Sequence, residues 1–152
     1  MDLYIRTMNA ANIHLYFNHF PIIGTIFCSL ILICSRIWKN ETVAKTGLYL
    51  FILTGLLAIP AFLSGEGAED ILESIGQKNE SFIEHHEEIA ETAFWVCEIA
   101  TVLAIITLIS IKRKMKFANL ISMIVLLLGL VNAFLFYKVG NTGGDIRHTE
   151  VR

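Results

Sequence analysis

The sequence has little charge and little proline. Of its 152 residues only 17% are charged and two are proline, whereas 55% are hydrophobic, and the mean hydropathy is +0.61. Soluble globular domains carry about 25% charged residues. The composition therefore excludes an ordinary soluble domain and indicates a chain that lies in a lipid bilayer.

Several signatures of defined chemistry are also missing. There is no Cys-x-x-Cys-His sequence, which excludes covalent c-type haem. Cys28, Cys34 and Cys97 all lie inside apolar runs, where we expect them to act as packing residues. The chain has no glycine-rich nucleotide loop and no Ser/His/Asp signature. No nucleic-acid partner is expected, because the basic cluster at 112–116 is explained as a determinant of membrane topology.

What the chain does contain is four long apolar runs, at Phe20–Ile37, Ala44–Leu63, Ala93–Ile111 and Phe117–Tyr137. Each is close to the ~20 residues that a helix needs to cross the hydrocarbon core. Lipid offers no partners for backbone N–H and C=O groups, so helices are the economical solution. The sequence predicts an all-α, four-helix transmembrane bundle, a single domain over residues 1–152 with spans at 13–38, 44–64, 82–112 and 117–139.

The charges are divided between the two ends of these runs. The side with the connections after the first and third runs carries seven basic residues and one acidic residue, and the opposite side carries five basic and thirteen acidic residues. The positive-inside rule predicts that the first side is cytoplasmic and that both termini are extracytoplasmic. We expect a multi-pass protein of the bacterial inner membrane.

All five histidines fall at the end away from the lysines. His14 and His19 open the first apolar run, His85 and His86 precede the third, and His148 follows the fourth. Imidazole is a common ligand for haem iron and for Fe, Cu or Zn ions. The pattern predicts a cofactor or metal held at the periplasmic surface.

Helix phase separates the histidines. At 100° per residue His86 shares its face with small side chains, namely Ala90, Ala93, Cys97 and Ala104. Such a face either packs closely or leaves room for a flat cofactor. His85 shares its face with larger residues, so His86 is favoured. His14 and His19 lie about 140° apart on an ideal helix and need not serve one atom.

A glycine-bearing segment, Gly140–Gly144, follows the fourth run and permits a sharp turn. We expect the tail to fold back over the bundle, with His148 as a ligand and Arg147 pairing with a haem propionate.

The stretch from His14 to Ile22, His-Leu-Tyr-Phe-Asn-His-Phe-Pro-Ile, resembles the His-Pro-x-x-x-His-Phe-Pro-Ile opening of a family of small four-helix bacterial membrane proteins known as a domain of unknown function. Leu15 stands where that family has proline. A glycine-bearing end of the second run and a histidine before the third are similar too. The resemblance implies a redox setting beside cytochrome c or Rieske-type modules and favours b-type haem.

The leading prediction is an electron-transfer subunit, rather than a stand-alone enzyme, that binds one or two haem b groups through His14, His19, His86 and His148. His19 and His86 are the expected axial pair of one haem, which is favoured over two; the extra histidines allow a second haem, for instance with His14 and His148. The alternative is a His/Glu metal site of a transporter or di-metal enzyme. Its weaker candidate ligands are His85, Glu66 and Glu91.

Against that alternative, Glu-x-x-His does not recur on another helix, and no polar stripe is expected to continue to the lysine side. A third possibility is a cofactor-free scaffold subunit of a respiratory complex.

Overall fold

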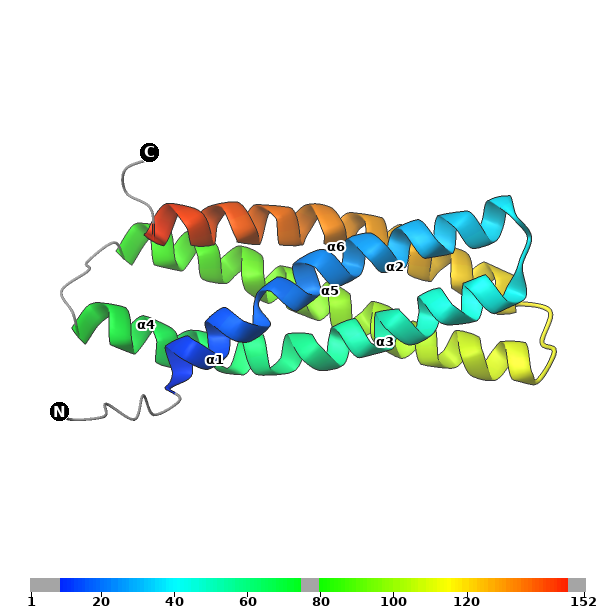
Figure 1. The fold of residues 1–152 in the computed structure, drawn as a ribbon, viewed down its shortest axis with the longest axis horizontal. Helices are drawn as coiled ribbons and strands as arrows, with labels where there is room; N and C mark the ends of the chain where they lie inside the picture. The colour runs from blue at the N-terminus through cyan, green and yellow to red at the C-terminus, as the bar shows by residue number, and fades with distance from the viewer. Residues whose placement is uncertain (1–8, 75–79, 148–152) are drawn as a thin grey trace, which may run out of the picture.

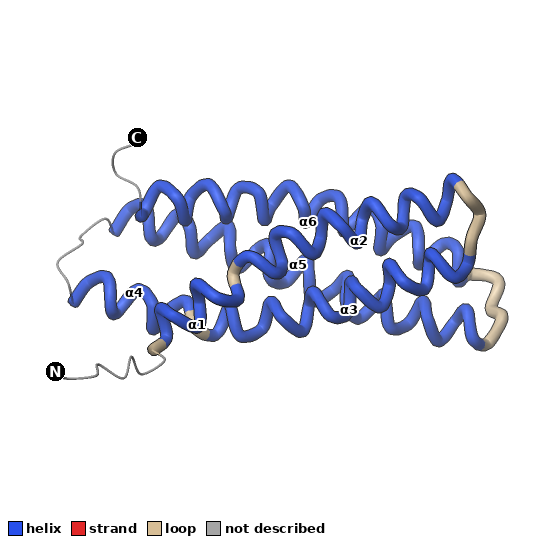
Figure 2. The backbone as a smooth tube through the Cα atoms, in the orientation of Figure 1, coloured by secondary structure: helices blue, strands red, loops and turns tan. Residues whose placement is uncertain are grey.

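The structure, a computed structural model, describes residues 9–74 and 80–147, and in that part of the chain every regular element is a helix (Figures 1 and 2). The helices are α1 (Ala10–Phe17), α2 (His19–Ile37), α3 (Glu41–Leu63), α4 (Gly65–Ser74), α5 (Glu80–Lys112) and α6 (Ala118–Arg147).

Four stretches are long and apolar enough to cross a membrane: Ala10–Ile37, Glu41–Leu72, Ser81–Lys112 and Ala118–Ile146. Large apolar side chains cover the outside of the bundle along its length, as lipid-facing residues do; they include Phe27, Leu56, Ile99 and Leu127. The prediction of an all-α chain with four helices of membrane-spanning length is confirmed. Which side of a membrane each end faces stays a prediction.

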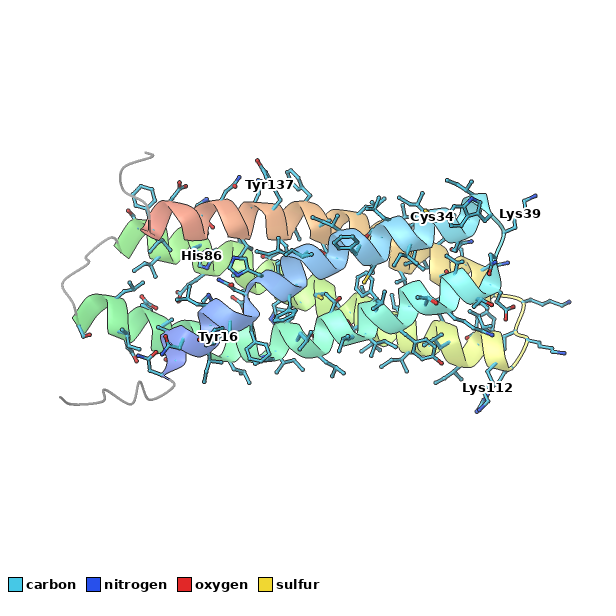
Figure 3. The ribbon with its side chains drawn as sticks, in the orientation of Figure 1. Tyr16, Cys34, Lys39, His86, Lys112 and Tyr137 are labelled. Atoms are coloured by element: carbon cyan, nitrogen blue, oxygen red, sulfur yellow. The ribbon has the colours of Figure 1, made fainter. Side chains whose placement is uncertain are left out.

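The four long helices form a ring, in which α2 and α5 each pack against both α3 and α6. The α2–α3 and α5–α6 turns lie at one end, marked by Lys39 and Lys112 in Figure 3, which we call the lysine end. The other end carries α1, α4, the start of α5 and the last turns of α6, with His86 and Tyr16; we call it the histidine end (Figures 1 and 3). The separation of histidines from lysines that the sequence predicts is therefore present in the fold.

The first predicted helix, 13–38, is broken into α1 and α2 at Asn18. Pro21 has no backbone N–H, so the carbonyl of Phe17 receives no helical hydrogen bond from it. The chain bends there, as helices commonly do near proline (Figure 2). As a result α1 leaves the direction of α2 and packs on α3 and α4.

Both turns at the lysine end are built in the same way. Lys39 and Lys114 adopt left-handed backbone conformations, with φ of 50° and 55°. The N–H groups that follow them reach back into the preceding helices, from Asn40 to the Ser35 carbonyl (3.1 Å) and from Met115 to the Ser110 carbonyl (2.9 Å). This is the Schellman arrangement, which satisfies the last carbonyls of a helix. The lysine end is closed by two short, hydrogen-bonded turns.

The bundle core contains small residues at close helix contacts. The stripe on α5 predicted from helix phase is buried, with Ala93, Cys97 and Ala104 fully inaccessible, so the phase prediction is confirmed. Gly55 of α3 lies directly against Thr101 of α5; a Cβ on Gly55 would clash with the Thr101 side chain. Close approach through small residues is how membrane helices gain packing energy in lipid.

The C-terminal part of the bundle differs from the sequence prediction. Instead of turning at Gly143 and Gly144, α6 continues as a helix to Arg147. Each glycine weakens a helix by about 1 kcal/mol but does not end it, and tertiary packing outweighs that preference. The predicted fold-back of the tail is therefore wrong for the residues up to Arg147, and His148 lies outside the described residues. α6 thus extends beyond the predicted span at 117–139, whose bounds in a membrane stay a prediction.

The connection between α3 and α5 contains a further helix, α4, over Gly65–Ser74. Ser35 and Thr107 are buried toward the lysine end. Their hydroxyls donate to carbonyls of their own helices, Leu32 and Leu103, at 2.7 Å. They are thus satisfied locally and do not by themselves make a transport path.

Candidate functional site

His14 is held at the histidine end by the carboxyl end of α3. It is half-buried on α1, and its Nδ1 lies 2.9 Å from the carbonyl oxygen of Ala61. A carbonyl only accepts, so Nδ1 must be the donor, and the proton of the neutral ring is on Nδ1. The lone pair of Nε2 is then available to a ligand. The proline-induced bend matters here, because it directs α1 onto α3.

His86 is held in the same way from the other side of the bundle. It is half-buried on α5, with Nδ1 2.9 Å from Oγ1 of Thr142 on α6. The Thr142 hydroxyl also lies 3.1 Å from the carbonyls of Lys138 and Val139. When it donates to one of them it accepts from His86, whose proton is then on Nδ1 as in His14.

Glycine makes room for the His86 ring. A Cβ on Gly143 would lie 3.3 Å from Cε1 of His86, tighter than an ordinary van der Waals contact. Gly143, which we expected to lie in a turn, instead allows α6 to approach the imidazole of His86 closely.

The two anchored rings come from opposite parts of the bundle. His14 belongs to the group formed by α1, α3 and α4, and His86 belongs to the α5–α6 pair. The rings nevertheless lie close enough for a charge on one to act on the other. Nearby, the carboxyl groups of Glu69 on α4 and Glu87 on α5 are in hydrogen-bonding contact, which also joins the two parts. The histidine end thus presents two neutral imidazoles, each oriented by a second hydrogen bond, as metal-ligating histidines usually are.

The other predicted ligands are placed differently. His19 is exposed on α2, where it lines an apolar groove between α2 and α3 rather than facing His86. The predicted pairing of His19 with His86 stays a prediction. His85 is exposed, consistent with its predicted helix phase, and Glu66 and Glu91 are exposed too.

Arg147 and His148 were the predicted site residues of the C-terminal tail. Arg147 is the last residue of α6, and its side chain, like the whole of His148, lies outside what the structure describes. Their predicted roles stay predictions.

A multi-ligand metal site finds no support in the described ranges. Within residues 9–74 and 80–147 no three His, Cys, Asp or Glu side chains converge in a way that could hold a metal ion.

Sequence reasoning missed Thr142 and the Ala61 carbonyl. Thr142 lies inside Gly140–Gly144, which we expected to form a turn. If this segment had been predicted to be helical, Thr142 would have been placed one turn after Lys138. The Ala61 carbonyl has no side-chain signal and depends on the bend at Asn18.

Comparison of the chain with protein-family models, with curated proteins and with solved structures found no match in any of the three. The resemblance to the four-helix family therefore stays a prediction.

Proposed function

We propose that this chain is a membrane electron-transfer subunit, similar to a b-type cytochrome, that binds one haem b between His14 and His86 at the histidine end. The observation that carries the proposal is the matched pair of imidazoles, each with Nδ1 2.9 Å from a fixed hydrogen-bond partner. Hydrogen bonds of this kind fix the tautomer and the ring orientation, which prepares Nε2 to bind a metal.

The chemistry of His14 and His86 fits a haem. The donor set is two neutral nitrogen ligands from facing parts of the bundle, and Gly143 keeps the space beside the His86 ring free of a side chain. When bound with two imidazoles, haem supplies a reversible one-electron couple without an open position for O₂. Such a protein passes electrons and does not need a substrate pocket.

A single haem is favoured over two. A second axial pair would need His19, whose exposed ring lines the α2–α3 groove, away from the anchored pair.

We place the histidine end on the periplasmic side of the bacterial inner membrane. Lys39, Lys112 and their neighbours gather at the opposite end, and basic loops favour the cytoplasm (Figure 3). The partners would then be other membrane or periplasmic redox subunits, of cytochrome c or Rieske type. A reporter inserted at Arg113 should read as cytoplasmic, and the reverse result would contradict this orientation.

The experiment for the function is an optical spectrum of the purified, detergent-solubilised protein before and after reduction by dithionite. The proposal predicts a sharp α band in the reduced protein and haem b in about equimolar amount. A featureless spectrum, with bound Fe, Cu or Zn found by elemental analysis, would favour the His/Glu metal site instead. A featureless spectrum without metal would favour the scaffold subunit.

A further inference from the structure

One carboxyl group lies inside the apolar part of α5. Glu98 falls within the apolar run Ala93–Ile111. At 1.5 Å per residue it lies about 10 Å along the helix from Glu91, the nearest charged residue toward the histidine end, and about 21 Å from Lys112 at the lysine end. A carboxyl group at such a depth is energetically unfavourable in lipid, and it commonly marks a functional position.

Two contacts between α5 and α3 place the Glu98 side chain. One turn before it, Phe94 stacks on Phe62 of α3, with ring centroids 4.1 Å apart. One turn after it, Thr101 lies directly against Gly55 of α3. Residues at i, i+4 and i+7 share one helix face, so Glu98 lies on the same side, along the seam between α3 and α5.

The same position borders the outer surface of the bundle. Trp95 and Val102, each about one turn from Glu98, are 55% and 54% exposed, and Glu98 itself is half-buried. Its Oε1 atom is nevertheless buried. The carboxyl group therefore lies at the boundary between packed protein and the region that lipid occupies.

No positive charge among the described residues pairs with this carboxyl group. Glu98 makes no ion pair there, and its Oε1 has no hydrogen-bond partner. The nearest titratable neighbour is the thiol of Cys97, the preceding residue. The helices packed on α5 are α3 and α6, and their charged and titratable residues lie toward the helix ends: Glu41, Lys45 and Tyr49 on α3, and Tyr137, Lys138, Asp145 and Arg147 on α6.

An ionised carboxylate is poorly compensated in these surroundings. Removing a carboxylate from water without a partner costs far more free energy than removing the neutral acid. The one open polar atom on the same face is the Thr101 Oγ1, which is also buried without a partner. A hard cation would offset the charge, but such ions take about six oxygen ligands, many more than Glu98 and Thr101 provide. A proton needs only the carboxyl group itself.

We propose that Glu98 is a proton-binding site within the membrane, with its carboxyl group protonated at neutral pH and accessible from lipid. This inference goes beyond the proposed electron-transfer function and does not depend on it, because it rests on the position and surroundings of Glu98 alone.

The test compares two carbodiimides on the full chain in phosphatidylcholine nanodiscs at pH 7. The acid O–H adds across a C=N bond of the reagent without a leaving group, so mass spectrometry detects the summed mass on the modified residue. We expect lipid-soluble dicyclohexylcarbodiimide to modify Glu98 and not the exposed Glu91 of the same helix. A water-soluble carbodiimide with an added amine should show the reverse selectivity.

Matched variants provide two further measurements. The infrared carbonyl band of a protonated carboxyl group should be present at pH 7, disappear in Glu98→Gln and remain in Glu91→Gln. Glu98→Leu removes no ion pair of the described residues and leaves no polar group unpaired, so the midpoint of SDS-induced unfolding should be unchanged or higher.

Four results would overturn the inference: no dicyclohexylcarbodiimide adduct on Glu98, a carboxyl band that persists in Glu98→Gln, a clearly lower unfolding midpoint in Glu98→Leu, or protection of Glu98 by sodium but not by choline. The third would indicate a paired carboxylate and the fourth a cation site. Since the labelling does not require haem, a protein with the Glu98 adduct but no α band would contradict the proposed function and support the proton site. A haem-containing protein without the adduct would do the reverse.

Discussion

The glycines in the middle of the bundle and those in the last turns of α6 have different surroundings. In the middle, Gly55 and Gly129 let helices touch, so that a Cβ would collide with Thr101 in one case and with Ser29 and Phe51 in the other. At the histidine end, Gly144 of α6 has open space around it, and Gly143 faces an imidazole. Gly67 of α4 also lies close against Ala10 of α1, so at this end only the surroundings of Gly144 are open.

The comparison teaches how the fold supports a site. The tightly packed middle and the two short turns at the lysine end determine the direction of each helix. These directions determine the geometry of the histidine end. The anchored pair of His14 and His86 is therefore positioned by helices whose stability is provided elsewhere.

The largest expected effect is on the packed middle. Gly55→Ala would place a Cβ against Thr101, and we expect it to lower the free energy of unfolding by about 2 kcal/mol, within the usual cost of overpacking a core. The measurement is thermal or SDS-induced unfolding in detergent micelles, followed by circular dichroism. Unchanged stability would show that the α3–α5 contact is looser than described.

A smaller effect is expected from the residue that positions His86. Thr142→Val keeps the shape of the side chain but removes the acceptor for Nδ1. Loss of such a second hydrogen bond typically weakens metal binding about tenfold or more, so haem affinity should fall by at least that factor and the α band should shift. Thr142→Ser, which retains the hydroxyl, should restore both. An unchanged spectrum in Thr142→Val would show that this hydrogen bond does not tune the ligand.

The smallest effect is expected where the histidine end is open. Gly144→Ala meets no atom within 4 Å and replaces glycine inside a helix, so it should stabilise the protein by about 0.5–1 kcal/mol. The same unfolding measurement applies. Destabilisation comparable to that of Gly55→Ala would remove the contrast between the two regions.

Much of the fold could be predicted because the membrane restricts the solutions. Apolar run length predicted the four long helices, and helix phase predicted that Ala93, Cys97 and Ala104 would be buried with His86 rather than His85. Both inferences need only the geometry of one helix.

The positions of His14 and His86 could not be predicted, because they depend on how helices are placed relative to one another. The bend at Asn18 turns His14 toward α3, and the continuation of α6 through Gly140–Gly144 brings Thr142 to His86. Proline and glycine permit these features but do not require them, since contacts between helices decide the outcome.

The central claim is that His14 and His86, and not their neighbours along the chain, hold the haem. The most direct test is electron paramagnetic resonance of the oxidised protein, comparing His86→Ala with the adjacent control His85→Ala, and His14→Ala with His19→Ala. We expect the low-spin haem signal to disappear in His14→Ala and His86→Ala, to return on addition of free imidazole, and to persist in both controls. Retention of the signal in His86→Ala, or its equal loss in His85→Ala, would contradict the account.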